Sequence, residues 1–363
     1  MSRPDVGERL LDRTLAFVAI PSVGRDDAAM FAEVRASIPS GMELVDDADG
    51  ALFAAPPGDG RQLVLLVGHV DTVPSRDADL PRREGRVIVG RGAADMKGGI
   101  AVMLELAAAP AGDVALGLVV VGREELPISE SALVPLLERS ERLRNAALAI
   151  VLEPTANALE LGCMGNLNAR VTVTGTAAHS ARPWLGDNAI HRAITALGSL
   201  ADLPIRDLEV DGLVFREVVS ITTIEGGTAQ NVIPDRVEAH VNFRYAPSHT
   251  PEVAEARLLE LLGHRDVAVE IVANAPPAPV AVANPLVARL REAGGLEVRP
   301  KQAWTPVAEL AMHGIDAVNL GPGDPRYAHA DDERVDVDAL VRTYDVLRRF
   351  LAGTPTTREE PIA

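Results

Sequence analysis

The chain has 363 residues, of which 47% are hydrophobic and 3% aromatic, and its formal net charge is −17. This length exceeds what one hydrophobic core usually serves, so we expect two domains. A chain that is acidic and has no cluster of basic residues is not expected to bind the phosphate backbone of a nucleic acid. The single cysteine, Cys163, excludes an internal disulfide and fits a reducing compartment.

The amino-terminal residues MSRPDVGERLLDR carry Asp5 and Glu8 and lack the apolar core of a secretory signal. No apolar stretch approaches the roughly 20 residues that a membrane-spanning helix needs. We therefore expect a cytoplasmic protein that does not enter a membrane.

The first part of the chain alternates helical and strand patterns. It predicts an amphipathic helix from Val6 to about Ile20 and a second around Asp27–Ile38. A strand, a turn and a strand follow up to Gly68, and another helix begins just after Asp95. Strands and helices then alternate as far as Glu153. This order predicts an α/β domain with a largely parallel sheet.

The pattern changes near Asn168, where apolar and polar residues alternate as in a half-exposed strand. A helix over Asn188–Leu200, two strands joined through a turn containing Pro234, a helix over Pro251–Leu262 and a last strand follow. The resulting β-α-β-β-α-β order predicts a ferredoxin-like α+β domain with an antiparallel sheet. We expect it to be inserted into the first domain, with residues 168–277 lying between 1–167 and 278–363.

Four apolar runs each lead to a carboxylate or a histidine, which is the most informative pattern in the chain. Such runs are typical of strands buried on both faces, and α/β sheets bind ligands beyond the carboxyl ends of their strands. The runs are QLVLLVG before His69 and Asp71, VALGLVVVG before Glu124 and Glu125, ALAIVL before Glu153, and AVNLGPG before His329. Together with Asp95 in GRGAADMKGG, these side chains suit two divalent metals.

Each of these residues could also have a simpler role when taken alone. Asp95 could be a helix N-cap, and the Glu124–Glu125 pair could be solvated surface acids. Glu153 could be an acidic residue of a loop, and His329 could be a surface histidine. Convergence on one sheet edge favours a site instead. Structural zinc usually binds thiolates, which one cysteine cannot supply, so the mixed set of histidines and carboxylates predicts a catalytic centre.

Several motifs, in this order, resemble the zinc aminoacylase and carboxypeptidase family. They are GHVDTVP, GRGAADMKGG, the Glu-Glu pair, EPT, GTAAHS, QNVIPDRVEAHVNFR and GPGDPRYAHADDE, and they span nearly the whole chain. GCMGNL, AHSARPWLGDNAIH and KQAWTPVAEL are most similar to the actinobacterial members that hydrolyse N-succinyl-LL-2,6-diaminopimelate. The resemblance implies a homodimer formed through the inserted domain.

The resemblance also implies residue roles around two Zn²⁺ ions, for which Co²⁺ can substitute. One zinc would be held by His69, Asp95 and Glu153, and a second by the bridging Asp95 with Glu125 and His329. Asp71 would orient His69, Glu124 would be the general base, and His179 would stabilise the oxyanion in the partner subunit's site. Asn231 and Arg244 would bind the substrate carboxylate, and Arg182 is a further candidate cation for the substrate.

The substrate remains open at this level. Pro306 stands where the actinobacterial pattern usually has an acidic residue, and the Met164–Asn166 segment lacks a basic residue found in many other relatives. Another N-acyl-amino-acid deacylase, such as an acetylornithine deacetylase, or a dipeptidase is the alternative enzyme. A binding module that kept the fold without catalysis is the alternative of another class.

Overall fold

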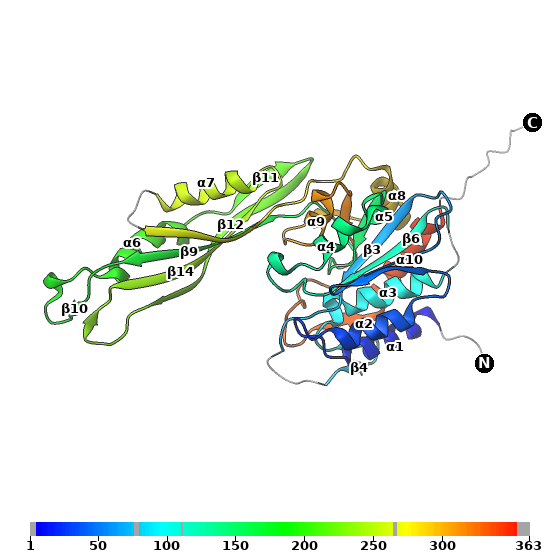
Figure 1. The fold of residues 1–363 in the computed structure, drawn as a ribbon, viewed down its shortest axis with the longest axis horizontal. Helices are drawn as coiled ribbons and strands as arrows, with labels where there is room; N and C mark the ends of the chain where they lie inside the picture. Colours follow the sequence, from blue (N-terminus) through cyan, green and yellow to red (C-terminus); the bar gives the residue numbers. More distant parts are fainter. Residues whose placement is uncertain (1–4, 76–79, 110–111, 264–266, 354–363) are drawn as a thin grey trace, which may run out of the picture. The chain divides into compact units, whose positions relative to one another are not determined.

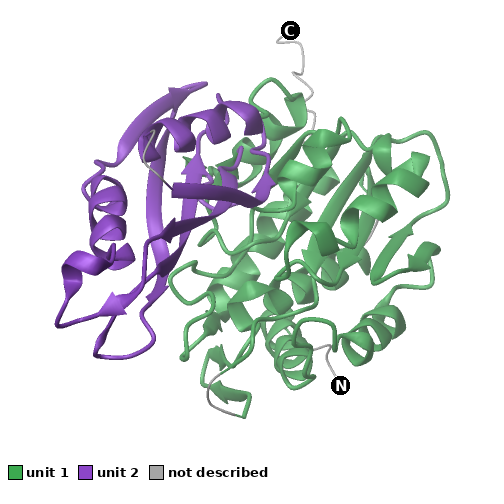
Figure 2. Ribbon diagram, turned by 60° about the vertical axis from the view of Figure 1, so that its left-hand side comes forward, with its two compact units in different colours: residues 1–161, 281–299, 305–363 green, residues 162–280, 300–304 purple. Residues whose placement is uncertain are grey.

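The computed structural model describes residues 5–75, 80–109, 112–263 and 267–353. Contacts divide the chain into two compact units, with unit 2 formed by residues 162–280 and 300–304 and unit 1 by the remainder (Figure 2). Unit 2 is a few residues longer at each end than the inserted domain expected from the sequence. The reason is a backbone bridge between Cys163 and Ala278, which closes the unit beyond its first and last long strands.

Unit 1 is built on an eight-stranded mixed sheet in the order β1-β2-β6-β3-β7-β17-β8-β16. The central strands β6, β3, β7 and β17 are mutually parallel, and antiparallel strands flank them. The central strands are apolar along their length because both faces are covered. The strands are β1 Glu43–Ala48, β2 Ala51–Ala55, β3 Leu63–His69, β6 Ala115–Val121, β7 Leu148–Val151, β8 Leu159–Leu161, β16 Val298–Pro300 and β17 Ala317–Asn319.

Helices cover this sheet, as Figure 1 shows. Helices α1, α3 and α10 pack against one another, α8 packs against α10, and α9 packs against α4 and β17. A small sheet, β18-β5-β4, and a single π-helical turn over Ala93–Lys97 lie beside them. The helices are α1 Val6–Val18, α2 Ala28–Ser37, α3 Gly98–Ala107, α4 Leu133–Arg139, α5 Glu141–Arg144, α8 Pro285–Gly294, α9 Val307–Met312 and α10 Val337–Ala352; the small strands are β4 Arg82–Glu84, β5 Val87–Val89 and β18 Arg334–Asp336.

Unit 2 has an antiparallel five-stranded sheet in the order β11-β12-β14-β9-β15. Without β11, this is the order of a ferredoxin-like domain, in which the first strand lies between the third and the fourth. The elements are β9 Gly165–Thr174, α6 Ala189–Ala201, β11 Arg206–Val210, β12 Leu213–Gly226, β14 Arg236–Tyr245, α7 Pro251–Leu262 and β15 Val267–Ala275, with the short pair β10 Ala178–His179 and β13 Val232–Ile233. The predicted alternation of helices and strands is therefore present, and β11 is an addition that the sequence did not suggest.

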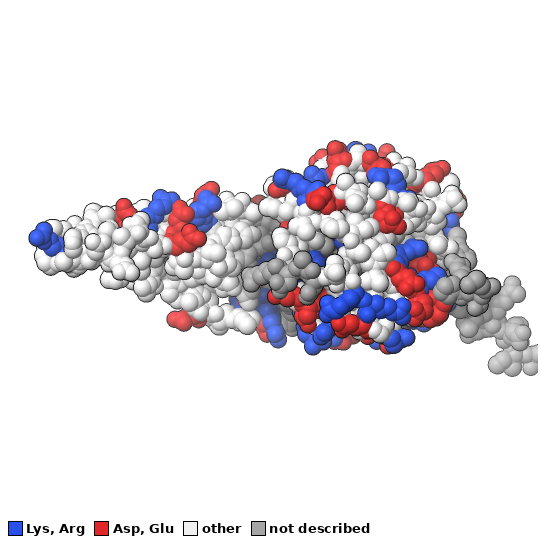
Figure 3. Space-filling model, turned by 90° about the horizontal axis from the view of Figure 1, so that it is seen from below, with Lys and Arg blue, Asp and Glu red and all other residues white. Residues whose placement is uncertain are grey.

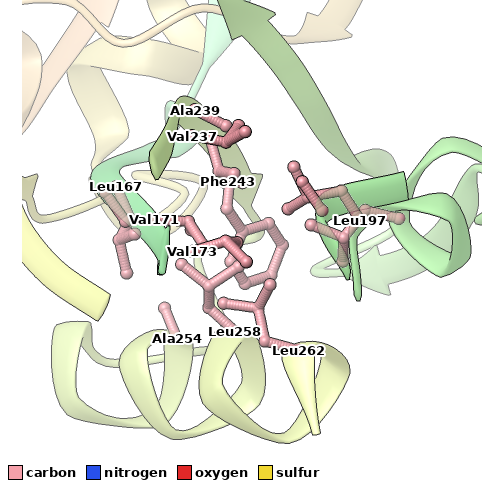
Figure 4. Packing of buried hydrophobic residues seen from close by; sticks show 14 of the residues in the cluster. Leu167, Val171, Val173, Leu197, Val237, Ala239, Phe243, Ala254, Leu258 and Leu262 are labelled. Atoms are coloured by element: carbon pink, nitrogen blue, oxygen red, sulfur yellow. The ribbon is translucent and has the colours of Figure 1, made fainter. Parts of the chain in front are cut away.

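The two faces of the unit 2 sheet differ because side chains alternate along each strand. Residues such as Leu167, Val171 and Phe243 point to one face and pack against Leu197 of α6 and Leu258 of α7 (Figure 4). The intervening residues of β9 and β14 are polar and half-buried or exposed, and they lie on the opposite face. This polar face carries one of the predicted substrate-binding residues.

Charged side chains of both signs are interspersed on the face of the molecule in Figure 3. Many form exposed ion pairs, such as Arg83 with Glu8 and Arg299 with Glu297, which contribute little to stability because water and salt screen them. Within the described ranges, no helix combines the length and the apolar character that crossing a membrane would require.

Candidate metal centre and substrate-binding residues

The carboxyl ends of the parallel strands bring the predicted ligands together. His69 is the last residue of β3, Glu124 and Glu125 follow β6, and Glu153 follows β7. Because β3 lies between β6 and β7 in the sheet, His69 is flanked by acidic residues from both neighbouring strands. Asp95 reaches the same edge from the π-helical turn before α3.

One group of donor atoms surrounds the buried imidazole of His69. Its Nε2 lies 3.0 Å from Oδ1 of Asp95 and 3.6 Å from Oε1 of Glu153. Two donors that bind one zinc in a tetrahedron at about 2.0–2.2 Å are roughly 3.3 Å apart. The spacing of these atoms therefore fits a single divalent cation.

A second group lies around His329, whose side chain is half exposed. Its Nε2 lies 2.9 Å from Oε1 of Glu125 and 3.4 Å from Oδ2 of Asp95. Asp95 thus turns one carboxylate oxygen toward each histidine. A carboxylate in this position can bridge two cations about 3.5–4 Å apart, the arrangement found in two-metal hydrolytic sites.

The loop that carries His329 passes very close to the loops of the other ligands. A Cβ on Gly321 would lie 2.2 Å from the carbonyl oxygen of Glu153, and one on Gly323 would lie 2.4 Å from that of Ala94. The backbone N–H groups of Ala156 and Asn157 donate to the carbonyl groups of these two glycines. Glycine is therefore required at both positions, because any side chain would separate the loops.

Asp71 contacts both halves of the site. Its backbone carbonyl lies 2.9 Å from Nδ1 of His69, and its Oδ1 lies 3.6 Å from the same nitrogen. The carboxylate also accepts hydrogen bonds from the backbone N–H groups of Glu124, at 3.1 Å, and Glu125, at 3.0 Å. Asp71 therefore fixes the loop that carries the Glu-Glu pair, a contact that the sequence did not suggest.

The gathered charges shift the pKa values of the site in opposite directions. Burial and the nearby carboxylates of Glu153 and Glu125 raise the pKa of Glu124 well above its usual value. Burial would raise the pKa of Asp95, but its hydrogen bonds to His329 and His69 lower it. Hydrogen bonds to Asp95 and Glu125 raise the pKa of His329 to about 10. The gathered carboxylates therefore favour positive charge at this site, and without bound cations Glu124 is suited to hold a proton.

His179 lies on the short strand β10 of unit 2 and is exposed. Its Nδ1 accepts a hydrogen bond from the backbone N–H of Ala181 at 3.0 Å. In the neutral imidazole the proton is therefore on Nε2, which can donate to a ligand. Asn231 lies beside it, because the Asn231 carbonyl accepts the N–H of Ser180, and the N–H of Arg182 donates to the carbonyl of His179.

Arg244 lies on the polar face of the same sheet and is half-buried. Its Nε donates to Oδ1 of Asn242 at 3.1 Å, while Nδ2 of Asn242 donates to the side-chain oxygens of Asn166 at 2.7 Å and Asn168 at 2.9 Å. In the described part of the chain, the two terminal NH₂ groups of Arg244 make no side-chain hydrogen bond. This arrangement leaves the fork of the guanidinium available to a carboxylate.

The predicted substrate-binding residues of one chain lie at opposite ends of strand β14. His179 and Asn231 precede the start of β14 at Arg236, whereas Arg244 is its penultimate residue (Figure 1). The eight residue-to-residue steps from Arg236 to Arg244 span roughly 26 Å in an extended strand. Asn231 and Arg244 of one chain therefore cannot bind the same carboxylate.

Sequence reasoning missed two residues, Glu333 and Asn242, that hold predicted site residues in place. Glu333 accepts the backbone N–H of Asp95, and Asn242 holds Arg244. Glu333 ends an acidic run, Asp331 to Glu333, in which nothing distinguishes it from its exposed neighbours. Asn242 is recognisable only from the register that sets it opposite Asn168.

Comparisons with known proteins agree with this fold. Residues 161–270 match the model of the peptidase dimerisation domain of the M20 peptidases. A Mycobacterium tuberculosis protein named as a candidate succinyl-diaminopimelate desuccinylase is 40% identical over 94% of this chain and 98% of its own. The succinyl-diaminopimelate desuccinylase of Corynebacterium glutamicum is 36% identical over 80% of both chains. The crystal structure of an M20 metallo-carboxypeptidase from Sulfolobus solfataricus matches with a TM-score of 0.75 at 18% identity, covering 96% of this chain and 99% of its own.

Proposed function

Because this chain belongs to the M20 peptidase family, among the succinyl-diaminopimelate desuccinylases, we propose that it hydrolyses N-succinyl-LL-2,6-diaminopimelate to succinate and LL-2,6-diaminopimelate. The reaction breaks a linear amide bond in the synthesis of lysine and cell-wall precursors. The observation that carries the proposal is the carboxylate of Asp95, which presents one oxygen to each of two histidines.

We assign His69, Asp95 and Glu153 to one zinc ion and Asp95, Glu125 and His329 to another, with Co²⁺ as a substitute. Histidine and carboxylate donors without thiolates are typical of catalytic sites that keep positions open for water and substrate. When bound, such metals lower the pKa of water toward 7 and polarise the substrate carbonyl. The donor spacing described above supports this assignment.

Glu124 is the proposed general base. One of its carboxylate oxygens lies within 4.8 Å of ligand atoms of His69 and Glu153, so it would be placed to take a proton from the attacking water and then give it to the leaving amine. The carboxylate of Asp71 accepts hydrogen bonds from the backbone N–H groups of Glu124 and Glu125 and so holds the proposed base in position. His179 donates from Nε2 to the oxygen that becomes negative in the tetrahedral intermediate, which is the role of an oxyanion-hole donor.

We propose that the active form is a homodimer joined through unit 2. A small-molecule substrate shorter than β14 cannot reach both ends of this strand in one chain, so His179 and Asn231 would act in the partner's site and Arg244 of the same chain in the other site. The dimerisation domain matched by residues 161–270 supports this arrangement. The guanidinium of Arg244 and the amide of Asn231 would bind substrate carboxylates, with Arg182 beside His179 as a further cation.

The direct test is an assay of the purified, zinc-loaded protein on two substrates. We expect kcat/KM for N-succinyl-LL-2,6-diaminopimelate to exceed that for N-acetylornithine by at least about 100-fold. The acetyl group lacks the terminal carboxylate of the succinyl group, so the cation that binds this carboxylate would be left unpaired, at a cost of several kcal/mol. A preference for N-acetylornithine or for dipeptides would overturn the substrate assignment. No turnover of any of them by the metal-loaded protein would favour a binding module.

A further inference from the structure

Glu333 is a buried carboxylate outside the proposed ligand set. It lies four residues after His329, and its side chain is 1% exposed. Its Oε1 accepts the backbone N–H groups of Ala94 at 3.1 Å and Asp95 at 3.0 Å. Its Oε2 accepts a hydrogen bond from Nη1 of Arg91 at 2.9 Å. The preceding residues of the acidic run are exposed, so only Glu333 turns inward.

One backbone hydrogen bond joins the same two loops, and a second lies within the loop that carries Glu333. The N–H of Gly90 donates to the carbonyl of Glu333 at 2.8 Å, and the N–H of Glu333 donates to the carbonyl of Ala330 at 3.2 Å. The residue is thus anchored through its backbone and uses its side chain to hold the loop that carries Asp95. One residue therefore connects the segments from which Asp95 and His329 extend.

A buried carboxylate is costly unless donors surround it, and here two amides and a guanidinium do so. Backbone N–H groups have fixed directions, so they determine where the peptide of Asp95 lies. The backbone of Asp95 departs from helical geometry, with φ −126° and ψ 92°, in the middle of the π-helical turn. A turn of this kind needs an external partner for the amides that the helix does not satisfy.

We propose that Glu333 is a positioning residue that holds Asp95 between His69 and His329. The inference rests on the proposed function, since it takes Asp95 as the carboxylate shared by both metals. Because one side chain serves both cations, displacing it weakens both sites together. Loss of a partner behind a metal ligand typically costs about 10–100-fold in metal affinity, and we expect a loss in this range for each site.

The test measures metal binding without substrate. The wild-type chain, stripped of metal, is titrated with Co²⁺ in competition with a chromophoric chelator, and the visible absorption of bound Co²⁺ is recorded. Glu333→Gln keeps the shape but sets an NH₂ group against Arg91 or against the backbone amides. Glu333→Asp keeps the charge but is too short to reach the same donors. The control is Glu105→Gln, which changes another buried carboxylate of unit 1, paired with Arg9.

We expect Glu333→Gln to lower the affinity of both equivalents of Co²⁺ by about 10–100-fold and to alter the Co²⁺ absorption, with Glu333→Asp in between. Glu105→Gln should lower the thermal unfolding temperature but leave Co²⁺ affinity within about twofold of wild type. The proposal is overturned if a folded Glu333→Gln or Glu333→Asp chain binds both equivalents as the wild type does. If the wild-type chain itself binds no Co²⁺, the proposed metal function fails first.

Discussion

Asn242 holds Arg244 by accepting a hydrogen bond from Nε at 3.1 Å, and its own amide is held by Asn166 and Asn168. The guanidinium is therefore oriented before any ligand arrives. Pre-organisation of this kind lowers the entropic cost of ordering the side chain when a ligand binds. If Arg244 binds a substrate carboxylate as proposed, the substrate itself would have to order the guanidinium in a chain that lacks Asn242.

Asn242→Ala should weaken substrate binding rather than chemistry. Losing a hydrogen bond to a charged group costs about 1.5–3 kcal/mol, so we expect KM to rise by about 10-fold or more while kcat changes little. Thr250→Ala is the control, because it removes the N-cap of α7 in the same unit without touching Arg244. If both variants change KM equally, the effect of Asn242 is one of stability alone.

Glu124→Gln should abolish most of the activity while leaving the metal content of the protein unchanged. Removing a general base typically costs about 10²–10⁴-fold in rate, and we expect kcat to fall by about this factor. Metal content measured by atomic emission should be unchanged. Glu130→Gln, in the same loop but paired with Arg25, should keep wild-type kcat. Wild-type activity in Glu124→Gln would show that another group takes the proton.

A mixture of two inactive variants should regain activity if His179 acts in the partner's site. In a dimer of Glu124→Ala with His179→Ala, one site carries both defects and the other carries none. Random exchange makes half of the dimers mixed, so about a quarter of wild-type kcat should return. The mixture is assayed after unfolding and refolding together, with each variant treated alone as control. No recovery from a mixture shown to contain mixed dimers would place His179 in its own chain's site.

Gly321→Ala should destabilise unit 1, because the added Cβ would meet the carbonyl oxygens of Leu152 and Glu153 at 2.2 Å. Overpacking typically costs about 1–3 kcal/mol, and here backbone rather than a flexible side chain must move. Urea unfolding measures the loss. Gly41→Ala, with no atom within 4 Å of its Cβ, is the control. Equal stability of the two variants would contradict the close packing of these loops.

The buried acid Glu309 should make stability fall as the pH rises. Burial raises its pKa from 4.5 to about 7, so the folded chain favours the protonated form. The stabilisation is full below pH 4.5 and is lost as the pH rises through 7. Between about pH 4.5 and pH 8 the wild type should therefore lose about 2–3 kcal/mol of unfolding free energy that Glu309→Gln retains.

Urea unfolding at both pH values, without added metal, compares the two chains. Glu138→Gln changes an exposed acid of α4 and should follow the wild type. A Glu309→Gln chain with the same pH dependence as the wild type would show that Glu309 is ionised in the folded state.

The sequence predicted those helices and strands that are marked by a local pattern, such as a capping residue or a short apolar run. Asp27 and Asn188 directly precede α2 and α6, and α7 has the predicted bounds, Pro251–Leu262. The central strands were recognisable because short continuous apolar runs in an α/β chain are typical of strands covered on both faces. The mostly parallel sheet and the separate second domain are confirmed by the fold.

Other features depend on contacts between distant segments. Strand β11 is mostly exposed and exists through its hairpin with β12, so it has no apolar run of its own. The inward turn of Glu333 depends on the amides of Ala94 and Asp95, which lie 239 and 238 residues earlier in the chain. The predicted ligands lie together at one edge, whereas their roles as ligands, base and oxyanion donor stay predictions.

Strand β14 sets the distance between the predicted substrate-binding residues of one chain. An insertion of two residues within it would carry Arg244 about 6.6 Å further while keeping it on the polar face. An insertion of one residue would instead turn the guanidinium into the layer packed against α6 and α7. The separation between these residues can therefore change, with Arg244 kept on the polar face, only in steps of two residues.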